Sequence, residues 1–402
     1  SRGAQARRRQ LRLRRRHHAH AHLVEQGRAL TSDSRNAETP SRVTALRAHG
    51  FRNLQSLAFE PGSHFNVIHG DNGAGKSNLL EAIYYLGALK SFRGAKTDDL
   101  IALDSDSALL EATLEGGPAP HKLRIDVGRS QRRRLQLDGK RPRSTSLWHQ
   151  TVRMVLFHPG DLILASGAPD KRRAFLDRML EQMDPIYGST LASYEKALRS
   201  RNRLLKEERT DRRSVRAYDA ILSKAGAVGG QARRRLIDDL APRVVRAFSD
   251  VFAGDTPLGV RYLPRVEPTE QLIAEALERS FDKDRARGFT ADGPHGDDLE
   301  LRLHQVGARH HGSQGQHRTI VLALKTAQLD LLSERTGRVP ILLLDDVSSE
   351  LDRSRNRRFF EVLSHAGGQV FLTTTHPEFI LLENDRVDFH VDAGLVTGRV
   401  TR

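Results

Sequence analysis

The feature that most restricts the fold of this chain is the loop GDNGAGKS at Gly70–Ser77. It matches the pattern G-x-x-x-x-G-K-[ST] and lies between an expected strand, residues 65–68, and an expected helix, residues 77–89. Glycines let the backbone turn tightly, so its N–H groups and the positive end of the helix face an anion. The loop therefore predicts an α/β fold in which a strand, a phosphate-binding turn and a helix follow one another.

Each residue of this loop has an expected role in binding a nucleoside triphosphate. We expect Lys76 to bridge the β- and γ-phosphates and the hydroxyl group of Ser77 to bind Mg²⁺. The other residues expected to surround the phosphates are Gly70, Asp71, Asn72, Gly73, Ala74, Gly75 and Asn78. A glycine turn without a ligand is the alternative, but such a turn would rarely contain Lys76 and Ser77 in this context. The loop predicts a nucleotide-binding protein.

A second motif is the acidic pair at the end of VPILLLDD. The apolar residues before this pair are typical of a parallel strand buried on both faces. Asp345 and Asp346 come at its C-terminal end, where ligands bind in open α/β sheets. We expect Asp345 to bind Mg²⁺ and Asp346 to orient and polarise the attacking water. An acidic turn in solvent is the alternative for an isolated pair. Together with the phosphate loop, the pair predicts nucleotide hydrolysis.

A third segment, HGSQGQHRTIVLALK, changes without a break from small polar residues to an apolar helix. Ser313 and Gly315 stand where this helix begins, so unpaired N–H groups and the serine hydroxyl face outward and favour an anion. A simple helix cap, with Ser313 bonded to Gln316, is the alternative. Because the first two motifs already account for one phosphate site, the segment predicts a second phosphate contact.

The order of the three motifs resembles that of the ATP-binding-cassette ATPases. In that family a signature segment contacts the γ-phosphate held by the opposite subunit of a head-to-tail dimer. The resemblance implies ATP as the nucleotide, an ATP-dependent homodimer and a catalytic role for Ser313 beside Lys76 and Asp346. The further nucleotide contacts that it implies come from Ser313, Gln314, Gly315, Gln316, Asp352 and His376. For His376, an ordinary histidine at a strand end is an equal alternative.

Six blocks narrow the resemblance to the RecF family of bacterial DNA replication and repair proteins. The blocks are SFRGAK, GAPDKRRAFLD, YEKALRSRNRLLK, GPHGDD, SQGQHRTIVLALK and LLLDDVSSELD. This resemblance covers about Arg42 to the C-terminus and implies an ATPase head of the SMC type with a helical insertion. The chain departs from the family at Gly160 and Gly296, where the family usually has an acidic residue and an arginine.

The resemblance to the RecF family implies an ATP-dependent DNA clamp of recombinational repair and replication-fork maintenance. The ATP-induced dimer would bind single-stranded and double-stranded DNA at gaps or junctions, with weak DNA-stimulated ATP hydrolysis. RecO and RecR would cooperate with it in loading RecA during the SOS response, in the cytoplasm and without a membrane partner.

Two other classes share the catalytic motifs. A transporter nucleotide-binding subunit is the first alternative, but its helical subdomain should be shorter and less rich in arginine. A long coiled-coil ATPase is the second, but it needs hundreds of heptad residues between the motifs, and only 236 positions separate Ser77 from Ser313. The repair clamp therefore remains the preferred interpretation.

The charge of the chain fits a polyanionic partner. Residues 1–40 contain ten arginines and three acidic residues, so they supply +7 of the formal charge of +15 and leave +8 for the rest. A solvated, arginine-rich surface is as good an explanation from charge alone. The candidate DNA contacts are Lys90, Arg93, Lys96, Arg132, Arg133, Arg134, Lys171, Arg172, Arg173, Arg201 and Arg203. Few aromatic residues accompany them, so we expect contacts to the DNA backbone.

Composition divides the chain into three parts. Residues 1–41 are expected to be a disordered basic extension; 42–169 and 288–402 form the ATPase domain, and 170–287 a helical insertion domain. For the extension, DNA contact, an organelle transit segment and upstream sequence translated from a misassigned start are the alternatives. We favour the last, because the sequence begins without methionine. The absence of cysteine excludes disulfides and thiolate zinc sites, and no apolar run approaches the roughly 18 residues of a membrane span.

Overall fold

The computed structural model describes most of the chain after residue 39. The described residues are 40–208, 211–251, 256–346, 360, 363, 367–380, 382 and 385–401. Asp352 and nearly all of the expected extension, residues 1–41, lie outside them. Among the described residues, no helix has the length and apolar character needed to cross a membrane.

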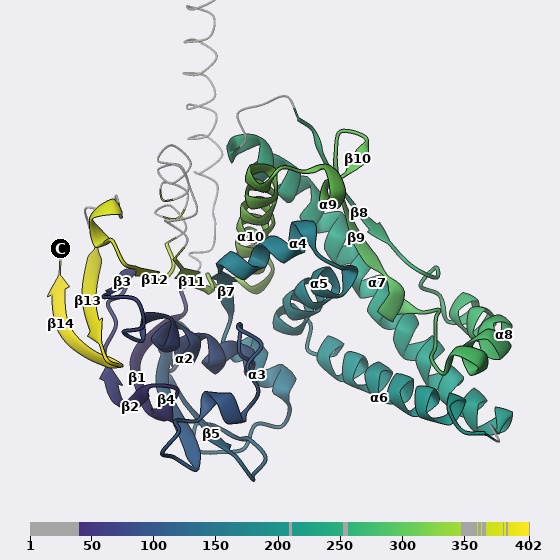
Figure 1. The fold of residues 1–402 in the computed structure, drawn as a ribbon, viewed down its shortest axis with the longest axis horizontal. Helices are drawn as coiled ribbons and strands as arrows, with labels where there is room; N and C mark the ends of the chain where they lie inside the picture. Colours follow the sequence, from purple (N-terminus) through teal and green to yellow (C-terminus); the bar gives the residue numbers. More distant parts are fainter. Residues whose placement is uncertain are drawn as a thin grey trace, which may run out of the picture. The chain divides into compact units, whose positions relative to one another are not determined.

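Strands and helices alternate in an α/β arrangement (Figure 1). The strands are β1 (Arg42–Phe51), β2 (Leu54–Phe59), β3 (Phe65–His69), β4 (Ser107–Glu115), β5 (His121–Gly128), β6 (Arg134–Leu137), β7 (Met154–Phe157), β8 (Leu258–Leu263), β9 (Asp298–Leu303), β10 (Val306–Gly307), β11 (Ile341–Asp345), β12 (Val370–Thr374), β13 (Arg386–Asp392) and β14 (Leu395–Thr401). The α-helices are α2 (Lys76–Ala88), α3 (Thr145–Thr151), α4 (Ile163–Ser166), α5 (Pro169–Met183), α6 (Tyr187–Leu205), α7 (Arg212–Val251), α8 (Glu270–Arg287), α9 (Ala308–His311) and α10 (Gln314–Thr336). Short 3-10 helices are η1 (Asp98–Leu100), η2 (Pro159–Leu162), η3 (Pro294–Gly296) and η5 (Pro377–Phe379).

The first sheet is antiparallel, with the order β2-β1-β4-β5-β6. The Asp138-Gly139 pair forms a tight turn after β6, with φ of 53° and 75°. An isolated bridge joins Leu137, before the turn, to Lys140, after it. No full strand pairs with β6 after this bridge among the described residues, so β6 is the one full strand of the hairpin.

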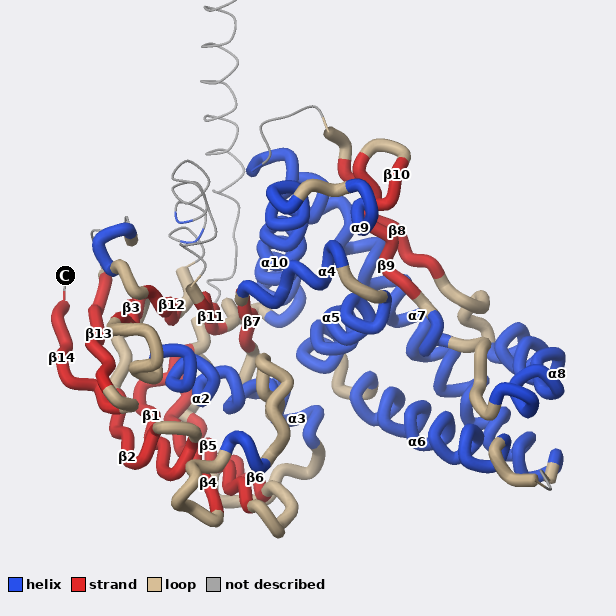
Figure 2. Tube along the Cα trace, in the orientation of Figure 1, coloured by secondary structure: helices blue, strands red, loops and turns tan. Residues whose placement is uncertain are grey.

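The second sheet has the order β14-β13-β3-β12-β11-β7 (Figure 2). All neighbours except β13 and β14 are parallel. The apolar run that ends in Asp345 forms strand β11 inside this sheet, as predicted, and β12 lies beside it. In the register of this sheet, Asp345 lies opposite Thr373, and Thr373 lies opposite Ile68. Because parallel strands end at one edge, the segments that follow β3, β12 and β11 meet there.

Helix α10 packs between two apolar cores. Ile320, Leu324 and other residues on one side join a core with α5, α7, β8 and β9. Leu322, Leu329 and other residues on another side join a core with β3, β7, β11 and β12. This double packing explains why the helix is apolar on nearly all sides after its first turn.

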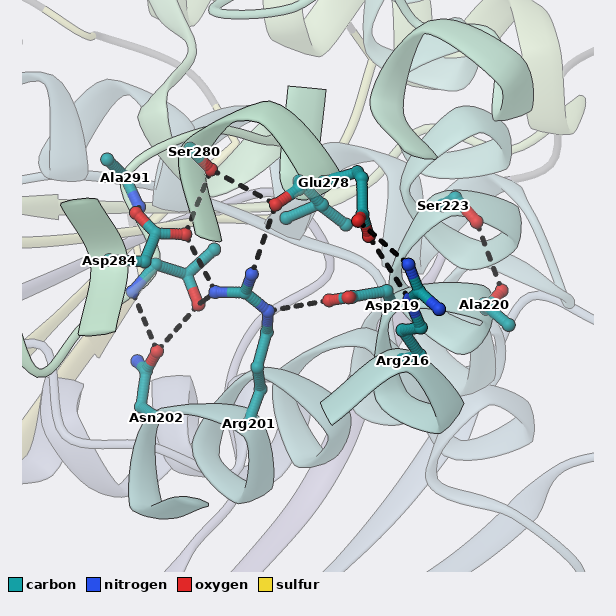
Figure 3. Close-up of polar contacts among 12 residues, drawn as sticks. Arg201, Asn202, Arg216, Asp219, Ala220, Ser223, Glu278, Ser280, Asp284 and Ala291 are labelled. Atoms are coloured by element: carbon teal, nitrogen blue, oxygen red, sulfur yellow. Dashed lines mark hydrogen bonds and ion pairs between the residues drawn. The ribbon is translucent and has the colours of Figure 1, made fainter. Parts of the chain in front are cut away.

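Helix α6, helix α8 and the part of α7 packed against them form a region that we call the helical tip. Its centre is polar: the guanidinium of Arg201 is fully buried and bonds to Asp219 at 2.6 Å and to Asp284 and Thr290 at 2.8 Å (Figure 3). Strand β8 interrupts the helical pattern expected for residues 170–287. The predicted domain boundaries remain a prediction.

Candidate nucleotide site

The phosphate loop joins the end of β3 to the start of α2, as predicted. Gly70, Gly73 and Gly75 have φ of 149°, 85° and 110°, a region of conformational space that favours glycine. Gly75 also caps the N-terminus of α2. A side chain at Gly73 would meet open space, so this part of the loop leaves room for a ligand.

The loop presents donors that fit a phosphate group. The N–H groups of Gly73 and Gly75 have no backbone acceptor among the described residues, and they stand before the positive end of a helix. The ammonium of Lys76 folds back to the carbonyl oxygens of Gly70 and Asp71, each at 2.8 Å. These contacts hold the lysine beside the loop, where a phosphate can replace the carbonyl oxygens as its partner.

Lys76 lies in the field of several carboxylates. Partial burial lowers the pKa of its ammonium below the usual range. The charges of Asp346, Asp71 and Asp345 act on the same ammonium and oppose this shift. The structure therefore brings the phosphate loop close to both acidic residues that the sequence analysis singled out.

Residues far away in the sequence support the phosphate loop. The N–H group of Gly394, in the turn between β13 and β14, donates to the carbonyl oxygen of Ala74 at 2.7 Å. The Asn78 side chain donates to Asn53 at 2.8 Å, and a Cβ atom at Gly75 would lie 2.7 Å from the Asn53 amide nitrogen. Sequence reasoning missed Asn53 and Gly394, because neither belongs to a local motif.

Thr373 holds the two acidic residues at the end of β11. Its hydroxyl donates to the Asp345 carboxylate at 2.8 Å and accepts from the N–H group of Asp346 at 3.0 Å. Asp346 has φ of 49°, so the chain turns sharply directly after the strand. Thr373 lies in β12, the neighbour of β11, and the register of these two strands places it opposite Asp345.

A divalent cation would find few protein ligands here. The described residues contain no group of three or more His, Asp or Glu side chains able to hold a metal ion. The hydroxyl of Ser77 and the carboxylate of Asp345 are suitable for Mg²⁺, which usually keeps water molecules and phosphate oxygens as its other ligands. The donor set fits a cation that arrives together with the nucleotide.

His376 follows β12 at the same edge of the sheet. Its imidazole is exposed and contacts the Glu378 carboxylate at 3.0 Å and the ring of Phe379. Its backbone N–H donates to the Thr374 hydroxyl at 3.0 Å. Both interpretations of this histidine, switch residue and strand-end residue, stay open.

The Ser313 segment forms a complete capping box at the start of α10. The Ser313 hydroxyl accepts from the N–H group of Gln316 at 3.2 Å, and the Gln316 side chain accepts from the N–H group of Ser313 at 2.8 Å. Ser313 and Gln314 are exposed. Within the part of the chain that the structure describes, no hydrogen bond or ion pair joins Ser313–Gln316 to the phosphate loop.

Lys325 joins α10 to the parallel sheet. Its buried ammonium donates to the carbonyl oxygen of Leu156 at 2.6 Å and lies 3.1 Å from the Asp161 carboxylate. Burial alone would raise the pKa of Asp161, but the charge of Lys325 and contacts with His158 hold this pKa at about 2. Sequence reasoning missed this pair, although a lysine inside the apolar run IVLALK was a visible signal.

The two departures from the RecF family pattern have local structural reasons. A Cβ atom at Gly160 would lie 2.6 Å from the ring of His158, which accepts the Gly160 N–H. A Cβ atom at Gly296 would lie 2.9 Å from the side chain of Arg265, which pairs with Asp292. At both positions a side chain of this protein occupies the space that a larger residue would need.

The structure corrects part of the expected set of DNA contacts. Arg172 and Arg201 are 5% and 0% exposed and form ion pairs inside the protein, so the prediction that they bind DNA was wrong. Arg173 donates to the carbonyl oxygen of Asp297 and is partly buried. The exposed members are Lys90, Arg93, Lys96, Arg132, Arg133, Arg134, Lys171 and Arg203.

Residues 42–391 match the model of the RecF/RecN/SMC N terminal domain family. The protein is 38% identical over 345 residues to the DNA replication and repair protein RecF of Myxococcus xanthus, a match that covers 83% of this chain and 90% of the relative. The chain belongs to the RecF family. The RecF protein of Anaeromyxobacter sp. strain K is 37% identical to this chain, and the match covers 100% of that protein and 90% of this chain.

Solved structures of RecF agree with this family. The fold is similar to the recombination mediator protein RecF-ATPrS in the RecFOR pathway, with a TM-score of 0.83, 30% identity and coverage of 90% of this chain and 99% of that chain. The corresponding RecF-ATP structure has a TM-score of 0.84 at 28% identity, with coverage of 92% and 100%. The α/β ATPase head of the SMC type expected from the sequence is therefore confirmed.

Proposed function

We propose that this RecF family member is an ATP-dependent DNA-binding clamp of recombinational repair and replication-fork maintenance. ATP binding at the phosphate loop joins two copies of the chain, and the dimer binds DNA at gaps or at junctions of single and double strands. Hydrolysis then releases the dimer. The relatives' roles in DNA replication and repair and the RecF structures with ATP support this proposal.

One observation carries the proposal. The phosphate loop lies close to Asp345 and Asp346, whereas the exposed Ser313 helix terminus has no hydrogen bond or ion pair with that loop among the described residues. An exposed helix N-terminus with a serine hydroxyl suits the γ-phosphate held by a second copy. Nucleotide binding is thereby linked to dimerisation, because ligand shared across an interface stabilises the associated state.

Each residue of the site has a proposed role in the reaction. Lys76 and the loop amides bind the β- and γ-phosphates, and Ser77 and Asp345 hold Mg²⁺, which neutralises charge on the phosphate oxygens. Asp346 orients the attacking water, and Ser313 from the second copy stabilises charge on the γ-phosphate. Gln314, Gly315, Gln316, Asp352 and His376 are proposed as further contacts to the nucleotide.

A charge introduced at the helix cap separates a simple cap from a phosphate contact. Asp is as good an N-cap as Ser, so Ser313→Asp should leave thermal stability within about 1 kcal/mol. Its carboxylate would repel the γ-phosphate, so we expect no dimer with a slowly hydrolysed ATP analogue in analytical ultracentrifugation. Ser313→Thr is the matched control that keeps the hydroxyl. An ATP-dependent dimer of Ser313→Asp would contradict the role in the second copy's site.

Variants of the first site complete this test. Lys76→Met should abolish ATP-dependent dimerisation, because the γ-phosphate loses its cation. Asp346→Asn should retain ATP binding and reduce the hydrolysis rate by about 10²-fold or more, because the attacking water loses the group that positions it. Unchanged hydrolysis in Asp346→Asn would exclude this residue from the reaction.

DNA binding requires its own experiment. We expect gapped duplex to bind more tightly than intact duplex in a gel-shift assay with ATP, and both to bind weakly without it. The affinity should fall steeply with salt, because phosphate contacts release counterions. Equal, salt-insensitive binding of both DNAs would contradict a DNA clamp.

The finer biological role follows the family. We propose weak ATP hydrolysis stimulated by DNA, and cooperation with RecO and RecR in loading RecA during the SOS response. The check is the rate at which RecA displaces a single-strand-binding protein from gapped DNA, with and without this chain. The cytoplasmic location stays a prediction.

A further inference from the structure

Residues 129–143 form a strongly basic segment at the edge of the antiparallel sheet. The sequence RSQRRRLQLDGKRPR contains seven Lys and Arg residues and one acidic residue. It consists of the loop before β6, β6 itself and the turn that follows, next to β5 (Figure 2). Its one carboxylate, Asp138, already contacts the His121 ring at 2.8 Å and the N–H group of Lys122 at 2.8 Å. We call residues 129–143 the basic hairpin.

Two arginines of the basic hairpin fix its position on the protein. Arg129 donates to the carbonyl oxygen of Ala102 at 3.0 Å and to further carbonyl oxygens nearby. Arg133 donates to the carbonyl oxygen of Leu89 and to the Tyr85 hydroxyl at 3.3 Å, with its guanidinium over the Tyr85 ring. Leu135 and Leu137 of the hairpin also pack against the apolar core, and β6 pairs with β5, so the two arginines add to an anchored strand.

The other cations of the hairpin face solvent. Arg132 and Arg134, on either side of Arg133, are exposed, and their side chains make no hydrogen bond or ion pair with any described residue. Both line an open groove of about 690 Å³. Two acidic residues also line that groove: Asp126 is paired with Arg124 at 2.9 Å, and Asp106 is exposed. The further exposed cations of the hairpin are Lys140, Arg141 and Arg143.

We propose that the basic hairpin binds the phosphodiester backbone of DNA, with Arg132 and Arg134 as its principal contacts. This inference rests on the proposed clamp function and assigns the surface that the DNA contacts. Planar guanidinium groups bind phosphate oxygens in pairs, and unpaired neighbouring cations gain most from a polyanion. The hairpin has no aromatic residue to stack on bases, so the contact is independent of sequence.

The same hairpin contacts the helix that holds the phosphate loop. Arg133 bonds to the carbonyl oxygen of Leu89, directly after the C-terminal end of α2, and α2 begins at Lys76. A cation at this end stabilises the helix dipole. DNA bound by the neighbouring Arg132 and Arg134 would therefore shift Arg133 and, through it, α2. In this proposal Arg133 is a positioning residue between the DNA and the nucleotide.

The test is the salt dependence of DNA binding. The probe is a fluorescein-labelled 30-base-pair duplex with a five-nucleotide gap, measured by anisotropy with a slowly hydrolysed ATP analogue. Loss of two phosphate contacts in Arg132→Ala/Arg134→Ala should weaken binding about ten-fold or more and reduce the slope of log K against log salt by about 2. Arg132→Lys/Arg134→Lys should retain most of that slope and serves as the variant closest to the native fold.

Arg212→Ala/Arg216→Ala is the matched control, because it also removes two exposed arginines, both paired with Glu278, from the helical tip. We expect this control to keep the affinity and slope of the unmodified protein. If Arg132→Ala/Arg134→Ala binds like the unmodified protein, the hairpin is not the DNA surface, although the clamp proposal stands. If the unmodified protein itself does not bind the probe, the clamp proposal fails.

The role of Arg133 has a separate measurement. Arg133→Ala should keep most of the DNA affinity but lose the increase in ATP hydrolysis that DNA causes, because the link to α2 is removed. A merely structural role would change both quantities together. Full stimulation by DNA in Arg133→Ala would overturn the positioning role.

Discussion

The phosphate loop and the helical tip both hold polar groups in place, but by different means. Main-chain contacts fix the phosphate loop, above all the bond between Gly394 and Ala74, and glycines allow the close approach. Buried charges fix the helical tip, where Arg201 bonds to Asp219 and Asp284. Apolar residues in the tip form only small clusters on α6, α7 and α8.

The difference predicts how each region fails. A substitution at a backbone contact next to the ligand moves the binding site itself. The apolar core elsewhere in the fold stays packed, so stability changes less than ligand binding. A buried ion pair that loses one partner leaves an uncompensated charge, and that cost falls on stability. Damage to the phosphate loop should therefore reduce nucleotide binding first, and damage to the tip should reduce folding first.

The largest effect is expected in the helical tip. Arg201→Met removes the cation and leaves Asp219 and Asp284 buried without their partner, so we expect a loss of about 3–5 kcal/mol. Hydrogen exchange measured by mass spectrometry should show faster exchange in α6 and α8, with a smaller change in the parallel sheet. Arg199→Ala, an exposed arginine on the same helix paired with Glu195, should change stability by less than about 1 kcal/mol. Equal losses in the two variants would break the comparison.

The second effect concerns the support of the phosphate loop. Gly394 has φ of 82°, and a Cβ atom there would lie 2.2 Å from the carbonyl oxygen of Asn53. Gly394→Ala should cost about 1–3 kcal/mol and weaken binding of a fluorescent ATP analogue in titration, because the turn must move away from the loop. Gly337→Ala is the control: its φ is 63°, and a Cβ atom there would meet nothing within 4 Å. Nucleotide affinity that changes equally in both variants would count against the support.

The smallest effect is a pH dependence at the base of the tip. His295 contacts the Tyr194 hydroxyl at 2.7 Å and the carbonyl oxygen of Thr290 at 2.9 Å, and burial lowers its pKa. The unfolded chain then binds a proton more readily than the folded one, so stability falls as pH drops below about 6.5, by at most about 1.4 kcal/mol per pH unit.

Replacing this histidine isolates its contribution. His295→Gln should show a flatter decline in urea unfolding between pH 7.5 and pH 5.5 than the unmodified protein. His310→Gln, at an exposed position on α9, should leave the decline unchanged. A decline of the same steepness in His295→Gln would assign the pH dependence to other groups.

Local patterns predicted the nucleotide side of the molecule well. The phosphate loop, the buried strand that ends at Asp345, and the start of α10 near Ser313 lie where the sequence indicates. Each of these depends on residues within a few positions of one another, so spacing alone contains the information. The contacts of Asn53, Thr373 and Gly394 join distant segments, and no local pattern encodes them.

The helical region was harder to predict because charge does not reveal burial. Arg172 and Arg201 look like surface cations in the sequence, yet each has carboxylate partners from remote segments. Strand β8 was missed, although Leu258, Val260 and Tyr262 alternate with polar residues and glycine as a strand requires. Its position inside a long helical stretch hid this period of two.

The bond between Ala74 and Gly394 joins residues separated by 320 positions in the chain. During translation, the motif that binds phosphate leaves the ribosome long before the turn that braces it, which follows 320 positions later. The nucleotide pocket thus gains this backbone support only after the turn at Gly394 has been made, and ATP should select chains that contain this turn over shorter nascent ones.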